Sequence, residues 1–530
     1  MAEDQVYLRP NIVVEPLVDS WYAWAHLIPP ATAAMNIANR HLRIMESYVN
    51  APNVHRAAAK NPAMAGGPFV DYEDQRATEV SALIEKTRST RRDLLELAAA
   101  IKQLNEILLS EADGSSLEPL YARVPEPLKG YVELVYDLNN QPSFRIIEAL
   151  LYRSRFYDAS TQSIVMSTIN QDDRPFMLST PRLPGAVELH LPVPFAHRGL
   201  DRLFRMKREP GTVGAAWEAL GLDGEPDPLF SHCFTPQPPL PYQPYRGDGV
   251  RWRYFGHACL LVETKDVRVL LDPVLSYTYE TDISRYTYED LPDTIDFALI
   301  THNHLDHILL ETVLQLRHKV KNFVVPRNGG GALQDPSLKL LLRQIGFDNV
   351  IELDEFDSIP IPSGSITGLP FLGEHADLNI RTKLGWLLQV GRHKLLFAAD
   401  SCNIEHRLYE HIHRMVGDVD VLFLGMECDG APLSWIYGAL LTTPLERKKD
   451  QSRRLAGSNF QRGMEIVRQL NCREVYVYAM GMEPWLNYVM RTRYTEQSNP
   501  IIESNRLVEE CRKQGIKAER LFGELEILMN

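Results

Sequence analysis

The C-terminal half of the chain alternates short apolar runs with amphipathic stretches. Apolar and β-branched residues predict strands at 256–263, 267–273, 296–300, 322–326, 385–390, 394–399, 419–425 and 474–479. Helices are predicted at 308–316, 332–345, 460–470 and 500–514. The first two strands form a predicted hairpin. Strands interspersed with helices predict a layered domain whose helices lie outside its sheets.

The N-terminal half combines short strand signals with longer helical ones. Residues 11–14 predict a strand, and the clearest helical stretch runs from Arg76 to Ser110. Apolar residues in its later part recur at three- and four-residue steps, which gives a stripe that needs a partner surface. Either the domain's own core or a dimer interface would provide that partner surface. We identify no catalytic cluster in this half.

A proline-rich stretch separates the two halves. Residues 234–249 contain five prolines and two glycines, a composition that disfavours helices and inner strands and is typical of a stiff linker. The predicted organisation is a mixed helix and strand domain at 1–233, a linker at 234–249, and a catalytic domain at 250–530. The predicted fold class is therefore a two-domain protein of α+β and α/β character.

Composition narrows the class of protein. The 530 residues are 45% hydrophobic and 24% charged, which are ordinary globular values, and the formal net charge is −13. That charge disfavours nonspecific nucleic-acid binding. We find neither a signal peptide nor a run long enough to cross a membrane, and the six cysteines are scattered. These features predict a cytoplasmic protein without nucleic-acid or membrane partners.

One six-residue run carries most of the chemical information. Thr301 is followed by His302, Asn303, His304, Leu305, Asp306 and His307, between a predicted strand and a predicted helix. Imidazole and carboxylate are common ligands of zinc and non-haem iron, and this turn crowds four of them together. A polar turn with surface histidines is the alternative. The order of residues directly after a buried strand favours two adjacent metal sites.

Other short motifs place this run in a known family. The segments 256–258 (Gly-His-Ala), 271–273 (Leu-Asp-Pro), 373–375 (Gly-Glu-His) and 399–400 (Ala-Asp) occur in the order of the metallo-β-lactamase superfamily. The resemblance covers roughly residues 250–530 and implies an αββα sandwich with a dinuclear metal site. It further implies that His302 and His304 bind metal one, that Asp306 and His307 bind metal two, and that Asp400 bridges the metals.

Two departures from the usual hydrolase pattern affect the choice of metal. Glu374 and His375 compete for the position at which hydrolases supply a histidine to metal one. The stretch 475–483, where hydrolases place a final histidine for metal two, contains none. Ligation by Glu374 would give three histidines and three carboxylates, and oxygen ligands shift the preference from zinc towards iron or manganese. The missing histidine leaves a position open on metal two.

This pattern resembles the dinuclear iron β-hydroxylase family of chloramphenicol biosynthesis, over the N-terminal half as well. The resemblance implies two oxo- or hydroxo-bridged irons held by His302, His304, Asp306, His307, Glu374 and Asp400, with Glu427 as a further catalytic carboxylate. It implies an O2-dependent monooxygenase that hydroxylates the β-carbon of an aminoacyl thioester, p-aminophenylalanyl among the candidates. The implied partners are a carrier domain of a nonribosomal peptide synthetase and an electron donor, and a homodimer is expected.

Two rival functions remain open at this point. A dizinc hydrolase of a lactone, phosphodiester or thioester would use metal-bound hydroxide, and ligation by His375 instead of Glu374 would favour it. A non-catalytic carrier-binding module is the third possibility, although its site would be expected to have lost ligands. The basic run at 447–454 is either a solvated face or a docking site for an acidic partner or a phosphate.

Overall fold

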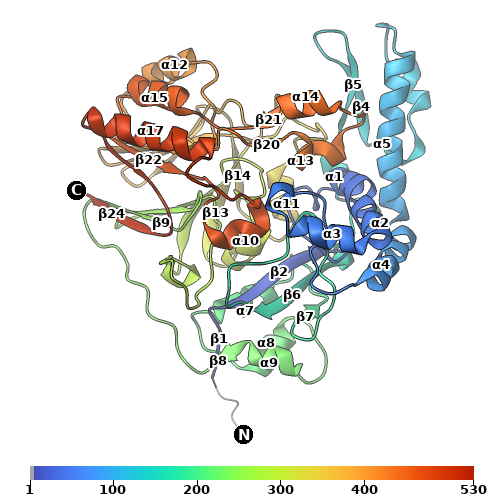
Figure 1. The fold of residues 1–530 in the computed structure, drawn as a ribbon, viewed down its shortest axis with the longest axis horizontal. Coiled ribbons are helices and arrows are strands. Elements are labelled where there is room, and N and C mark those ends of the chain that lie inside the picture. The colour runs from blue at the N-terminus through green and yellow to red at the C-terminus, as the bar shows by residue number, and fades with distance from the viewer. Residues whose placement is uncertain (1–4) are drawn as a thin grey trace.

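Two seven-stranded sheets face each other in the computed structural model, which describes residues 5–530 (Figure 1). In spatial order the first sheet contains β14 (Val350–Leu353), β13 (Val320–Pro326), β12 (Ile295–Leu299), β11 (Arg268–Leu271), β10 (Leu260–Glu263), β9 (Val250–Tyr254) and β24 (Leu525–Met529). The second contains β15 (Ser358–Ile361), β16 (Gly364–Leu369), β17 (Gly385–Val390), β18 (His393–Phe397), β19 (Val421–Gly425), β22 (Glu474–Tyr478) and β23 (Lys517–Arg520).

Side-chain alternation along the strands explains the layers. On β19, Val421 and Phe423 point into the core between the sheets, whereas Leu422 and Leu424 pack outward against helices. The helices that cover the second sheet are α12 (Arg407–Val416), α15 (Phe460–Gln469) and α17 (Asn499–Lys513). Helices α10 (Leu310–Leu316) and α11 (Leu338–Gln344) cover the first. The predicted αββα sandwich and the hairpin of β10 and β11 are confirmed.

The N-terminal half packs against the outside of α10. Its four-stranded sheet contains β3 (Trp21–Tyr22), β2 (Ile12–Val18), β6 (Gln162–Thr168) and β7 (Leu189–Leu191), and it shares a core with α10 and α11. Its helices include α1 (Pro30–Asn36), the π-helical turn η1 (Ile37–His41), α2 (Leu42–Asn50), α3 (Pro52–Ala59), α4 (Ala77–Thr90), α5 (Arg92–Glu111), α6 (Glu148–Leu151), α7 (Gly199–Arg205), α8 (Val213–Ala219) and α9 (Pro228–His232). Its remaining strands are β1 (Tyr7–Leu8), β4 (Val132–Tyr136), β5 (Pro142–Ile146) and β8 (Phe234–Thr235).

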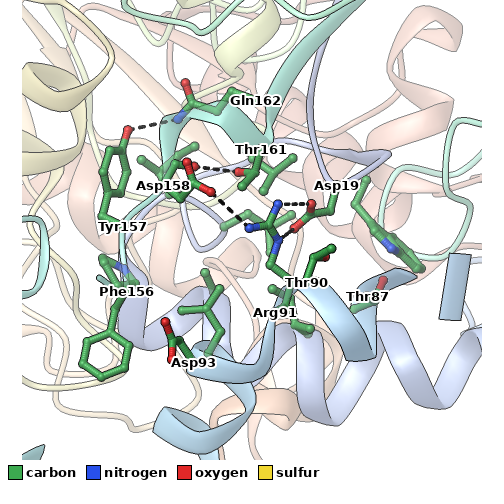
Figure 2. A pocket seen from close by; sticks show the side chains of 18 of the residues that line it. Asp19, Thr87, Thr90, Arg91, Asp93, Phe156, Tyr157, Asp158, Thr161 and Gln162 are labelled. Atoms are coloured by element: carbon green, nitrogen blue, oxygen red, sulfur yellow. Dashed lines mark hydrogen bonds and ion pairs between the residues drawn. The ribbon is translucent and has the colours of Figure 1, made fainter. Parts of the chain in front are cut away.

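The predicted strand at 256–263 begins only at Leu260 and the predicted helix at 332–345 only at Leu338, and two further elements differ as follows. The start of the predicted linker, residues 234–235, forms β8 and pairs with β1, and the described chain then has neither helix nor strand until β9. The predicted helix from Arg76 to Ser110 is two helices that meet at Arg91. The Arg91 guanidinium binds both carboxylate oxygens of Asp19 at 2.7 Å and contacts Asp158 at 3.3 Å (Figure 2). These ion pairs between distant segments accompany the break between the two helices. A pattern of apolar residues does not reveal them.

Further short elements surround one end of the sandwich. They are β20 (Ala431–Pro432), β21 (Arg454–Leu455), α13 (Ser434–Tyr437), the turn η7 (Gly438–Leu440), α14 (Arg447–Ser452) and α16 (Asn487–Met490). Within residues 5–530, no helix combines the length and the apolar character needed to cross a membrane.

A buried ionic cluster joins the two halves beside α10. Arg174 lies 2.5 Å from Glu15 of β2 and 2.7 Å from Glu311 of α10, and Arg182 lies 2.6 Å from Glu15. Burial opposes ionisation of Glu15, but Arg182 and Arg174 outweigh it and lower its pKa to about 2. Because this value lies below the ordinary 4.5, the stabilisation is complete above pH 4.5 and is lost as the pH falls towards 2.

Replacing Arg174 by Leu should destabilise the protein by about 3–5 kcal/mol at pH 7, because it leaves two buried carboxylates without their shared cation. Arg145→Leu is the matched control, since Arg145 pairs with Glu133 on an exposed hairpin. That change should cost no more than about 1 kcal/mol. Urea unfolding followed by circular dichroism measures both variants. Equal stability of the two variants would contradict the role of the cluster.

Candidate metal centre

All six predicted ligands lie where strands of the two sheets end. Strands β11 and β12 run parallel, as do β18, β19 and β22, so their carboxyl ends meet along one edge of the sandwich. The turn after β12 carries four of the side chains, and the loops after β16 and β18 carry one each: His302, His304, Asp306, His307, Glu374 and Asp400. All six are buried.

One group of donors surrounds the space beside His302. Glu374 Oε1 lies 2.8 Å from His304 Nδ1, and Glu374 Oε2 lies 3.6 Å from His302 Nε2. The three ligand atoms of this group lie within 4.8 Å of one another. Two imidazole nitrogens and a carboxylate at this spacing can surround one transition-metal ion.

A second group adjoins the first. His307 Nε2 lies 3.1 Å from Asp400 Oδ2 and 3.6 Å from Asp306 Oδ2, and His302 Nε2 lies 3.8 Å from the same Asp400 oxygen. Asp400 is therefore the carboxylate that faces both groups, in the position predicted for a bridging ligand.

The hydrogen bonding of these side chains fits bound cations. Among the residues that the structure describes, His302 Nε2, Glu374 Oε2 and Asp400 Oδ1 are buried without a hydrogen-bonding partner. Polar atoms are rarely left so in a protein interior, because the lost solvation costs about 1–3 kcal/mol each. His302 Nε2 and Glu374 Oε2 lie 3.6 Å apart within the first donor group, where a metal ion would supply the missing partner.

His375 Nδ1 lies 3.2 Å from Glu374 Oε2, and the donor group of His302 and His304 is completed by Glu374. His375 lies beside it, with Nδ1 3.3 Å from the Gly373 carbonyl oxygen and Nε2 without a hydrogen-bonding partner in the described chain. Its ring packs 4.5 Å from that of His304. Glu374 has a left-handed backbone, with φ at +61°, and Gly373 precedes it at +71°. Such a turn is uncommon for a non-glycine residue and aims the carboxylate back at the histidines.

Two side chains outside the predicted set, Asp272 and Tyr437, hold histidine ligands in place. Asp272 Oδ2 lies 2.8 Å from His307 Nδ1, which leaves Nε2 of that histidine free to face the cluster. The Tyr437 hydroxyl lies 2.8 Å from His304 Nε2, so that Nδ1 of that ring faces Glu374 and the cluster. Partners of this kind fix the orientation and tautomer of metal-bound imidazoles.

His257 holds the carboxylate of Asp306. The Gly481 backbone N–H donates to His257 Nδ1 at 3.1 Å, so the neutral ring carries its proton on Nε2. That N–H points at Asp306 Oδ2, 3.0 Å away. In the sequence, His257 stands out only as part of the Gly-His-Ala motif at 256–258. Its contact with Asp306 crosses 49 residues and has no local signal.

The N-terminal half also reaches the site. Asn39 and Arg40 of η1 donate to the carbonyl oxygens of Ala439, Trp435 and Ile436 at 2.7–3.0 Å. These bonds hold α13, which carries Tyr437 to His304. Trp435 Nε1 in turn donates to the Gly66 carbonyl oxygen at 3.1 Å. The N-terminal half, in which the sequence identifies no catalytic cluster, thus contacts the segment that supports the metal centre.

A cavity of about 460 Å³ leads to the cluster. His304, Asp306, Glu374 and Asp400 lie at its base, and its walls include Gly66 and Met490. Glu427, which follows β19, also lines it. Burial, and then the neighbouring carboxylates of Asp400, Asp306 and Glu374, raise the pKa of Glu427 well above its ordinary value. This fourth carboxylate faces the same space as the predicted ligands.

Comparison with known proteins identifies both halves. A family described as the diiron non-heme beta-hydroxylase N-terminal domain matches residues 7–238, and the beta-lactamase superfamily domain matches residues 267–433. The 4-amino-L-phenylalanyl-CmlP-peptidyl-carrier-protein 3-hydroxylase of Streptomyces venezuelae is 42% identical over 527 residues, 97% of this chain and 98% of that protein. The crystal structure of CmlA, a diiron beta-hydroxylase from Streptomyces venezuelae, superposes with a TM-score of 0.93 at 40% identity over 100% of both chains.

Hydrolase relatives match much less of the chain. The N-acyl-phosphatidylethanolamine-hydrolyzing phospholipase D 1 of Caenorhabditis elegans is 35% identical over 83 residues, 13% of this chain and 23% of that protein. The end-to-end match favours the oxygenase over the hydrolase and over the non-catalytic module. On its sequence and its fold, the chain belongs to the diiron non-heme β-hydroxylases, which are non-haem diiron monooxygenases.

Proposed function

We propose that this enzyme hydroxylates the β-carbon of an aminoacyl group held as a thioester on a peptidyl carrier protein of a nonribosomal peptide synthetase. The Streptomyces venezuelae relative acts on 4-amino-L-phenylalanyl carried by such a protein, and an aromatic aminoacyl group of this kind is the proposed substrate. The observation that carries the proposal is the entry of Glu374, a carboxylate, into the cluster of His302 and His304.

The proposed ligands divide into two sets. His302, His304 and Glu374 would hold one iron, and Asp306 and His307 would hold the other, with Asp400 available to both; the distances above support this division. When bound, the irons would supply O2 activation for a hydroxylation in which one oxygen atom is inserted into the C–H bond and the other leaves as water, with two electrons from an external donor and two protons.

The chain's own residues supply orientation and shelter. Asp272, His257 and Tyr437 restrict the ligand side chains to one arrangement, which a reaction at a fixed C–H bond requires. The protein surrounds the substrate in the cavity and limits the access of water. Glu427 is proposed as a catalytic carboxylate on the substrate side of the cluster, since it lines the cavity together with Asp400.

The proposal also assigns the electron donor and the roles of the two halves of the chain. The electron donor is a separate protein, and residues 1–233 contribute to homodimerisation and partner docking, whereas residues 250–530 carry the chemistry. The bonds from Asn39 and Arg40 to the segment that carries Tyr437 support a coupling between docking on the N-terminal region and the arrangement of the cluster.

Replacing Glu374 by Ala should lower the iron content and abolish turnover, because it removes a charged ligand. His375→Ala is the matched control: it removes a neighbour of the cluster and should leave most of the iron bound. Losing a group that only supports a ligand costs about 10–100-fold in affinity or activity. Elemental analysis and turnover assays measure both effects. Greater iron loss from His375→Ala would reassign the ligand.

The reduced enzyme should hydroxylate the aminoacyl group only when a carrier protein presents it. The carrier supplies binding energy that a free amino acid lacks, and that energy positions the reacting carbon. Single turnover of chemically reduced enzyme with O2 compares free amino acid, unloaded carrier and loaded carrier. Equal hydroxylation of the free amino acid would remove the carrier from the mechanism.

A further inference from the structure

Three hollows meet at Gly66 on the face through which the metal cavity opens. The metal cavity shares Ala65, Gly66, Arg491 and Arg493 with a second hollow of about 430 Å³. It shares Gly66, Pro432 and Trp435 with a third hollow of about 480 Å³. The entrance is therefore a broad, branched surface formed by both halves of the chain.

Positively charged side chains without partners surround this entrance. Lys60 and Arg493 line the second hollow, and Arg43 lines the third. Arg447 and Lys448 lie on α14, which contacts β20, and β20 pairs with β21 to form one wall of the metal cavity. All five side chains are exposed. Within residues 5–530, none of the five makes a side-chain hydrogen bond or an ion pair. We call these five residues the cationic rim.

Three acidic side chains at the entrance have partners within the protein. Asp71 pairs with Arg491 at 2.8 Å, while Asp173 and Asp429 accept hydrogen bonds from asparagine side chains. Glu73 lies in the second hollow as well. The five unpartnered cations of the rim thus lie around the entrance of a protein whose formal net charge is −13.

We propose that the cationic rim docks an acidic face of the carrier protein. This inference rests on the proposed function, because a tethered aminoacyl group can reach the cluster only from a carrier seated over the entrance. Elsewhere the negative net charge of the enzyme repels an acidic partner, so the rim both attracts and orients it. The run at 447–454, which the sequence left open, thus contributes Arg447 and Lys448 to the interface.

A charge-reversal pair tests the rim in the full-length iron-loaded enzyme. Arg447→Glu combined with Lys448→Glu should weaken binding of the phosphopantetheinylated carrier and raise KM for the loaded carrier, on the order of tenfold at low salt. kcat at saturating carrier and the iron content should not change. The difference from wild type should shrink at high salt, because salt screens exposed charges.

Arg468→Glu combined with Lys513→Glu is the matched control, with the same change in net charge. Both residues are exposed and lie in the last turns of α15 and α17. Helix α17 begins at the metal cavity, and its 15 residues place Lys513 about 20 Å away. The control should bind the carrier as the wild type does. Circular dichroism checks that both double variants are folded.

The outcomes separate this inference from the proposed function. Equal carrier binding by the rim and control variants would overturn the docking surface while leaving the reaction in place. Slower reduction by the electron donor with unchanged carrier binding would also overturn it and assign the rim to that donor. If the carrier binds through the rim but the wild-type enzyme does not hydroxylate its aminoacyl group, the docking surface is retained and the proposed reaction is rejected.

Discussion

Four carboxylates and three imidazoles converge at one edge of the sandwich. Much of the structure around them follows from the need to compensate the negative charge of these carboxylates. Asp306, Glu374 and Asp400 are buried, and Glu427 faces the same cavity. Isolated charges are strongly disfavoured in a protein interior, whereas charges that share cations are not. Several donor atoms face the cluster without a partner in the protein. The binding of two iron ions therefore accounts for buried carboxylates that would otherwise destabilise the fold.

The elements near the cluster restrict its geometry. Non-glycine residues with left-handed backbone recur beside it, among them His257, Asp272, Glu374 and Ala399. Such conformations persist where the surroundings fix them. Here the surroundings include Asp272 and Tyr437, which orient two imidazoles, and the bonds from η1 to the segment that carries Tyr437. The N-terminal half is thus part of the support of the centre, and the ionic cluster around Arg174 attaches it to the helix that follows the metal-binding turn.

The local part of this arrangement could be predicted from the sequence. The run from His302 to His307 is one turn, so its spacing alone brings four donors together, and short apolar runs located strands such as β17 and β19. Contacts between distant segments left no such pattern. The bond from His257 to Asp306, the contact of Tyr437 with His304 and the wall formed by Gly66 depend on tertiary packing. The break at Arg91 coincides with ion pairs to Asp19 and Asp158, which periodicity does not encode. The direction of the Glu374 carboxylate depends on a left-handed turn, which neighbouring residue types do not determine.

The identity of the bound metal tests the central claim most directly. Elemental analysis of the purified protein, together with its optical spectrum, should give about two irons per chain and the near-ultraviolet absorption of a bridged diferric centre, because the donor set is rich in carboxylates. Stoichiometric zinc that supports hydrolysis, with no oxygenase activity after iron loading, would contradict the account.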